Sequence, residues 1–120
     1  MGQAMRPLAL IVQHDHSQRE ILAVLLEESD MDVLQCESGE AANLVLDKFG
    51  MGIVLLVADT ELAGTLSGTD LVTAAKQRFP KMEVILTSDR KRPKDLPRSA
   101  TFLAKPWRPL DVLREAARIH

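Results

Sequence analysis

The sequence predicts an α/β fold in which helices cover both faces of a five-stranded parallel sheet. Short apolar runs alternate with segments of helical periodicity along the whole chain, and this alternation is typical of a doubly wound sheet. The length of 120 residues suits a single domain. We therefore expect one domain over residues 1–120, with residues 1–6 as a loose N-terminal extension.

Five apolar runs predict the strands of this sheet. The runs at residues 8–12 and 53–58 are continuously apolar, which is typical of strands buried on both faces of a parallel sheet. Residues 33–36, 84–86 and 102–104 predict three shorter strands.

Four helical patterns lie between and after the strands. Ser17 and Glu20 predict a capping box at the start of the first helix. Gly50 is a suitable C-cap for the second helix, the third ends before Pro80, and Pro109 suits the first turn of the last helix. The residues expected to face the core are Ile21, Leu22, Leu25 and Leu26, then Ala41, Leu44 and Val45, then Leu71, Val72, Ala75 and Phe79, and finally Leu110, Leu113 and Ala117.

The segment between the fourth and fifth strands, residues 88–101, is irregular in sequence. Pro93 and Pro97 each limit a helix, so we expect a shortened or irregular fourth helix here. Asp89 and Asp95 accompany a basic run, and no aromatic residue does, which favours a solvated loop over a nucleic-acid site. The basic run consists of Arg90, Lys91, Arg92 and Lys94.

Composition excludes several classes of function. The formal net charge of −2 gives no general attraction to nucleic acid or to anionic membranes. Cys36 is the only cysteine, which excludes an intrachain disulfide and favours a cytoplasmic setting. No apolar run approaches the roughly 20 residues that span a bilayer. Without a glycine-rich phosphate loop, no organic cofactor is expected, and a flavodoxin-like ligand-binding domain is a distant alternative.

Polar side chains follow four of the predicted strands. The carboxyl ends of parallel strands meet at one edge of the sheet, where ligands bind. A carboxylate, a hydroxyl and an ammonium would converge there, and together they can accept a phosphoryl group: the carboxylate attacks phosphorus and the other two hold its oxygens. The residues at these strand ends are Gln13, His14 and Asp15, then Asp59, then Thr87, and then Lys105.

The chain resembles the receiver domains of two-component response regulators over essentially its whole length. The matching pieces are LIV before a polar cluster, Arg19-Glu20-Ile21-Leu22, LLVAD ending in Asp59, SGTDLV, VILTS with Thr87, and FLAKP with Lys105. The resemblance implies a flavodoxin-like three-layer sandwich, as in chemotaxis regulators, with strand order 2-1-3-4-5. It also implies Asp59 as the phosphoacceptor, Thr87 as the switch hydroxyl, Lys105 as the phosphate-facing lysine and Phe102 as the switch aromatic. The Lys105–Pro106 bond matches a position that is often cis.

The same resemblance implies a role in phosphorelay signalling. Asp59 would take a phosphoryl group from a histidine kinase or a phosphotransfer protein, and the change would switch contact with a downstream protein that the sequence does not identify. The domain would then be no enzyme beyond self-catalysed phosphotransfer and dephosphorylation. No nucleic-acid or membrane contact is expected, and the sequence leaves the oligomeric state open.

One part of the pattern departs from the family. Two neighbouring acidic residues that help receivers bind Mg²⁺ are replaced here by Gln13 and His14. Because Mg²⁺ prefers charged oxygen ligands in octahedral geometry, we expect weak Mg²⁺ binding, through Asp59, the backbone of Glu61 and either Asp15 or His14. The alternative is a pseudo-receiver, a module of the same fold that binds partners without phosphorylation.

Overall fold

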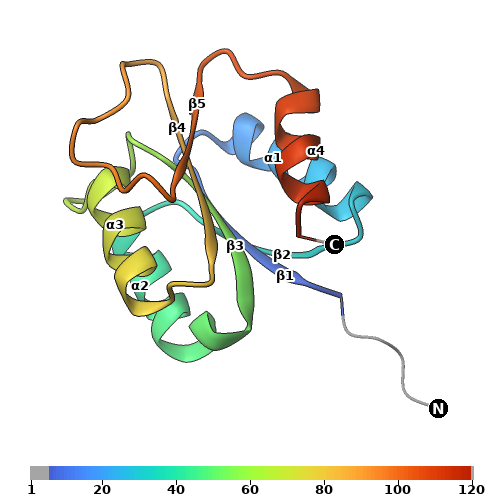
Figure 1. The fold of residues 1–120 in the computed structure, drawn as a ribbon, viewed down its shortest axis with the longest axis horizontal. Helices are drawn as coiled ribbons and strands as arrows, with labels where there is room; N and C mark the ends of the chain where they lie inside the picture. Colours follow the sequence, from blue (N-terminus) through green and yellow to red (C-terminus); the bar gives the residue numbers. More distant parts are fainter. Residues whose placement is uncertain (1–5, 120) are drawn as a thin grey trace.

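The computed structural model describes residues 6–119. Within this range five parallel strands form one sheet of order β2-β1-β3-β4-β5, which confirms the predicted fold (Figure 1). The expected N-terminal extension lies outside the described residues apart from Arg6, whose guanidinium donates a 2.8 Å hydrogen bond to the Glu27 carbonyl oxygen. The strands are β1 (Leu8–Val12), β2 (Asp32–Cys36), β3 (Ile53–Asp59), β4 (Glu83–Ser88) and β5 (Thr101–Ala104).

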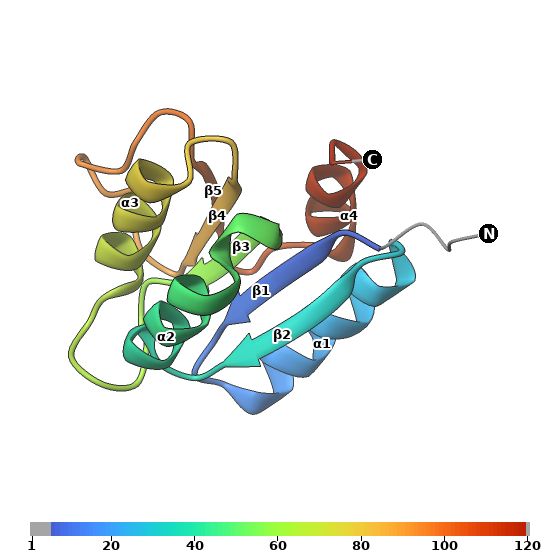
Figure 2. The same ribbon diagram turned by 90° about the horizontal axis from the view of Figure 1, so that it is seen from below.

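Helices cover both faces of the sheet (Figure 2). Helices α1 (His16–Glu28) and α4 (Pro109–Ala117) pack on one face. Helices α2 (Gly39–Phe49) and α3 (Gly68–Arg78) pack on the other, and a short 3₁₀ turn, η1 (Gly50–Gly52), follows α2. None of the helices in the described part of the chain has the length and apolar character that crossing a bilayer requires.

The first helix begins differently from the prediction. Asp15, not Ser17, is its N-cap residue, and the Asp15 carboxylate accepts a 3.2 Å hydrogen bond from the Gln18 backbone N–H. Aspartate is among the best N-cap residues because its side chain reaches the unpaired amides of the first turn. The predicted capping box at Ser17 was therefore wrong, and Asp15 has a structural role at the end of β1.

In three helices one or two of the residues expected in the core are exposed. The exposed residues that were predicted to face the core are Ile21 in α1, Leu44 in α2, and Leu110 and Ala117 in α4, with Leu44 exposed by 71%. The apolar residues of these helices occupy adjacent positions, so a helical period fits more than one face. The third helix has a single stripe, and its burial was predicted correctly. The residues that do face the core are Leu22, Ala23 and Leu26 in α1, Ala42 and Leu46 in α2, and Val112 and Ala116 in α4.

Residues 89–100, all of which the structure describes, contain no helix. This stretch, called here the irregular segment, packs Leu96 and Ala100 into the core on the side of α2 and α3. The guanidinium of Arg92 closes it on itself by donating to the Pro97 carbonyl oxygen at 3.0 Å. The prediction of a reduced fourth helix is thus confirmed in its extreme form, since prolines at two places prevent a continuous helical hydrogen-bond pattern.

Candidate functional site

The carboxyl edge of the sheet brings three of the predicted site residues together. Asp59 is the last residue of β3, and the strand register places it directly beside Thr87 of β4. Lys105 follows β5, and its backbone N–H donates to the Ser88 carbonyl oxygen at 2.7 Å, which extends the β4–β5 pairing to the lysine. The Lys105–Pro106 peptide bond is cis, as the resemblance implied.

The Asp59 carboxylate is buried, with 3% of the residue exposed, and both oxygens are engaged. Its Oδ1 accepts a hydrogen bond from the Glu61 backbone N–H at 2.9 Å. Its Oδ2 accepts one from the Thr87 hydroxyl at 2.9 Å and forms an ion pair with the Lys105 ammonium. A buried carboxylate is unfavourable without a counter-charge, so Lys105 provides the main compensation. We call Asp59, Thr87 and Lys105 the β3–β5 wall.

A glycine allows the chain to close tightly behind Asp59. A Cβ atom built on Gly68 would lie 1.8 Å from the Asp59 carbonyl oxygen, which no side chain could tolerate. Gly68 is the first residue of α3, and its N–H donates to the Thr60 carbonyl oxygen at 3.3 Å. The start of α3 therefore packs directly on the backbone of the strand end that carries the carboxylate.

The opposite side of the site comes from the end of β1 and consists of Gln13, His14 and Asp15; we call it the β1 wall. Gln13 is buried, and its amide Nε2 donates to Asp59 Oδ2 at 3.4 Å and to Gln18 Oε1 at 3.2 Å. Its own Oε1 accepts from the Asp15 backbone N–H at 3.1 Å. The β1 wall thus presents an N–H donor to Asp59 where the resemblance implies a carboxylate.

A buried arginine holds the β1 wall in place. The guanidinium of Arg19 donates to the Gln13 carbonyl oxygen at 2.9 Å, contacts His16 Nδ1 at 3.1 Å and lies 3.5 Å from the Glu37 carboxylate. The sequence interpretation used Arg19 only to align the first helix. A charged residue three positions before Leu22, on the helix face that enters the core, was the signal for its position.

The donors around the site do not match a magnesium centre. His14 is exposed, and the carboxylate of Asp15 caps α1. Among residues 6–119 no group of three or more histidine, cysteine, aspartate or glutamate residues is arranged to hold a metal ion. Mg²⁺ favours carboxylates and other oxygen ligands in octahedral geometry, but the Asp59 carboxylate is paired with Lys105 and that of Asp15 caps α1.

Two hydroxyl residues that the sequence interpretation did not select extend the site. The Ser88 hydroxyl oxygen accepts hydrogen bonds from the Thr60 hydroxyl at 2.9 Å and from the Arg90 backbone N–H at 3.0 Å. It therefore connects the ends of β3 and β4 to the start of the irregular segment. Phe102, the expected switch aromatic, lies half-buried in β5 and packs against the same core as α2 and α3.

The loop between Asp59 and α3 is fastened to α2 by a carboxylate. Glu40 Oε2 accepts hydrogen bonds from the Thr65 backbone N–H at 2.9 Å and from the Thr65 hydroxyl at 2.8 Å. These bonds lower the pKa of the Glu40 carboxyl from 4.5 to about 2. Gly64, at a φ of 84°, lets the loop turn against Glu40, since this left-handed conformation strains other residues.

Comparisons with known proteins identify the family and agree with the fold. The family model of the response regulator receiver domain matches residues 9–117. A receiver domain from Clostridium thermocellum has a TM-score of 0.79 at 21% identity, covering 93% of this chain and 92% of that one. The Francisella response regulator 1452 receiver domain gives 0.80 at 17%, covering 94% and 95%. The Vibrio cholerae chemotaxis response regulator CheY4 gives 0.81 at 18%, covering 97% and 100%. Comparison with curated proteins gives no significant match.

Proposed function

The chain belongs to the response regulator receiver domain family, and from this premise we propose that Asp59 accepts a phosphoryl group in two-component signalling. The donor is the phosphohistidine of a histidine kinase or of a phosphotransfer protein. The domain's own chemistry is limited to phosphotransfer and dephosphorylation at Asp59, and its output is an altered contact with a protein partner.

The arrangement of the β3–β5 wall is the observation that carries this proposal. A buried carboxylate, a hydroxyl 2.9 Å from it and a paired ammonium meet at the carboxyl edge of the sheet. Such a set supplies a nucleophile and two donors for the charge that develops on the phosphoryl oxygens.

The transfer step follows from these contacts. One Asp59 oxygen attacks phosphorus, an O–P bond forms and the P–N bond of the phosphohistidine breaks. The imidazole nitrogen leaves with the electron pair of that bond, and the ring, protonated on its other nitrogen, ends as neutral imidazole. The ammonium of Lys105 and the hydroxyl of Thr87 then move from Asp59 Oδ2 to oxygens of the bound phosphoryl group.

Weak Mg²⁺ binding is the second part of the proposal. In the absence of neighbouring acids, Asp59 and Lys105 already balance each other in charge, and Gln13 offers its N–H group to the carboxylate. A divalent cation would have to compete with these donors for the same oxygens. Asp59 and the Glu61 backbone oxygen are the groups that remain for it, and the metal contributes only charge neutralisation when bound.

A phosphorylation-independent interaction module is the second candidate. The contact between the Gln13 amide and Asp59 Oδ2 favours it, because each donor on this oxygen lowers its availability as a nucleophile. The two candidates differ in whether Asp59 is ever modified.

Incubation with acetyl phosphate, followed by intact-mass measurement over a range of Mg²⁺ concentrations, separates the two candidates. Phosphoacceptor function predicts an adduct of one phosphoryl group that disappears in Asp59→Asn. The matched control is Asp95→Asn, which alters an exposed carboxylate in the irregular segment and should keep the adduct. If no adduct forms at any Mg²⁺ concentration, the phosphoacceptor proposal fails and the interaction module stands.

A further inference from the structure

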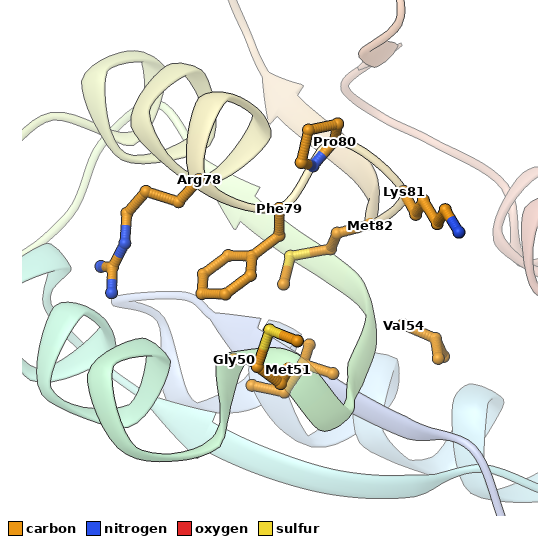
Figure 3. Close-up of a pocket in the computed structure, with 9 residues that line it drawn as sticks. Gly50, Met51, Val54, Arg78, Phe79, Pro80, Lys81 and Met82 are labelled. Carbon is orange, nitrogen blue, oxygen red and sulfur yellow. The ribbon is translucent and has the colours of Figure 1, made fainter.

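An open hollow lies at the edge of the sheet opposite Asp59, where β3 and β4 begin (Figure 3). Its volume is about 480 Å³, within the range of roughly 300–1,000 Å³ typical of ligand pockets. Gly50 and Met51 of η1 and Ile53 and Val54 at the start of β3 line one side. Residues 78–82, from the end of α3 and the turn into β4, line the other.

The hollow is shaped before any partner arrives. A Cβ atom on Gly50 would lie 2.3 Å from Cζ of Phe79, so the absence of a side chain lets the ring lie against the backbone of residue 50. The guanidinium of Arg78 lies 5.1 Å from the centre of the Phe79 ring and 2.8 Å from the Asp47 carboxylate. These contacts hold both Phe79 and Arg78 in place at the margin of the hollow.

The charged residues that line the hollow are both basic. None of its nine lining residues, all within the described part of the chain, is acidic, and Arg78 and Lys81 are the charged ones. Asp47 compensates Arg78 from outside the hollow. Lys81 is exposed and forms no ion pair with any residue from 6 to 119. An occupant with carboxylates would therefore be attracted here, chiefly by Lys81.

The shape of the hollow favours an extended occupant over an enclosed one. Met51 contributes to the lining and yet is 93% exposed, so the hollow is open on the side of η1. A small molecule held inside would leave that side chain in water, whereas a helix lying across the hollow would cover it. Met51 and Met82 both line the surface, and methionine adapts readily to apolar side chains of a partner.

We propose that this hollow docks an acidic amphipathic helix of a partner protein. An apolar side chain of that helix enters between Met51 and Phe79, and a carboxylate of the helix pairs with Lys81. This is the helix-in-groove mode of recognition, with charge complementarity at the rim. The site is separate from the Asp59 edge, and the proposal does not depend on phosphorylation.

A designed peptide tests the proposal on the whole chain. The probe is a capped 18-residue helix with leucine along one face and glutamate on its flanks, and the control peptide has lysine in place of each glutamate. Titration into ¹⁵N-labelled protein should shift the amide signals of residues that line the hollow, with the acidic peptide alone; these are Gly50, Met51, Ile53, Val54, Phe79, Lys81 and Met82. Met51→Asp and Lys81→Glu, both at exposed positions, should each weaken binding roughly tenfold.

Leu44→Asp is the matched control, because it replaces an exposed apolar residue on α2 that does not line the hollow. Its affinity for the acidic peptide should equal that of the unmodified chain, as should that of Asp59→Asn. Equal binding of the lysine peptide, shifts confined to other surfaces, or unchanged affinity in both Met51→Asp and Lys81→Glu would each overturn the proposal. A Met51-dependent dimer that excludes the peptide would overturn it as well, in favour of a second copy as the occupant.

Discussion

The two walls of the Asp59 site differ in how far they follow the family pattern. The β3–β5 wall keeps the carboxylate, the hydroxyl and the ammonium, and these groups contact one another directly. The β1 wall has an amide, an exposed imidazole and a carboxylate that is engaged as a helix cap. Under the proposed function, the β3–β5 wall has the groups that would hold a phosphoryl group, whereas the β1 wall lacks the two acids that the resemblance implies for a cation.

The comparison suggests how the electrostatics of the site remain balanced: the absence of two acids removes the negative charge that a divalent cation would neutralise. The family pattern places two further acids near the phosphoacceptor, which calls for a divalent cation. Here Asp59 faces one ammonium and a neutral amide donor, and the charges of Asp59 and Lys105 cancel each other without a metal. A buried carboxylate tolerates this arrangement because both of its oxygens accept hydrogen bonds, Oδ1 from the Glu61 N–H and Oδ2 from Thr87 and Gln13.

The largest effect should come from breaking the β3–β5 wall at its ammonium. Lys105→Met leaves the buried Asp59 carboxylate without its ion-pair partner, and we expect the free energy of unfolding to fall by about 3 kcal/mol. In the Asp59→Asn background the same substitution should cost less than about 1 kcal/mol, since no buried charge is left unpaired. Urea unfolding of the four proteins measures both values. Equal costs in the two backgrounds would show that Lys105 acts through something other than Asp59.

Introducing acids into the β1 wall should lower the stability of the metal-free protein and strengthen its binding of Mg²⁺. The double substitution Gln13→Asp and His14→Asp places carboxylates near Asp59, and repulsion should lower stability by about 2 kcal/mol in metal-free buffer. Mg²⁺ at about 100 times its dissociation constant should restore about 2.7 kcal/mol. Melting temperatures with and without Mg²⁺ measure the effect, with Gln77→Asp on the exposed surface of α3 as the control. A double variant that binds Mg²⁺ no better than the original chain contradicts the assignment of these two positions.

A smaller effect should show that Asp15 belongs to the helix and not to a metal site. Asp15→Ala removes the side chain that accepts the Gln18 N–H and should lower stability by about 1 kcal/mol. Ser17→Ala, at the cap position first expected, should change stability by less than about 0.5 kcal/mol. Chemical unfolding measures both, and a Mg²⁺ titration of Asp15→Ala should match that of the unmodified chain. A larger loss of stability in Ser17→Ala than in Asp15→Ala would mean that Ser17 is the N-cap residue of α1.

The smallest effect concerns the loop beside the β3–β5 wall. The pKa of Glu40 is lowered from 4.5 to about 2 because its carboxylate accepts two hydrogen bonds from Thr65. A lowered folded-state pKa stabilises the fold fully above about 4.5 and loses that contribution as the pH falls towards 2. Carbon-detected NMR should therefore show Glu40 titrating near 2, together with the Thr65 amide signal. Titration of Glu40 near 4.5 would mean that the loop is not fastened in solution.

The sequence predicted the strands and the strand ends more accurately than the helices. Strands buried on both faces are continuous apolar runs, so their prediction does not require deciding which face is buried. The helix faces were harder: Leu44, Val45 and Leu46 are adjacent, and periodicity does not decide whether Leu44 or Leu46 enters the core. The structure buries Leu46 and exposes Leu44. Packing against the sheet determines which of the two leucines is buried, and the local sequence pattern does not reveal it.

The candidate site shows the same limit at closer range. Alternation of strands and helices was enough to bring Asp59, Thr87 and Lys105 to one edge, because topology determines where parallel strands end. Side-chain contacts such as the donation from Gln13 to Asp59 depend on the rotamers of buried residues and were not predicted. The same holds for Arg19, whose guanidinium reaches back to the Gln13 carbonyl oxygen.

We expect the amide hydrogens of the irregular segment to exchange with solvent faster than those of the neighbouring strands. A helix there would share its hydrogen bonds along its length and would open as a unit, whereas this segment is held by Leu96, Ala100 and the contacts of Arg92. Local openings that break few contacts cost little free energy. Amide hydrogens of the non-proline residues in 89–99 should thus exchange with solvent through brief local openings, while those of β4, the strand that leads directly into this segment, should exchange only when the whole domain unfolds.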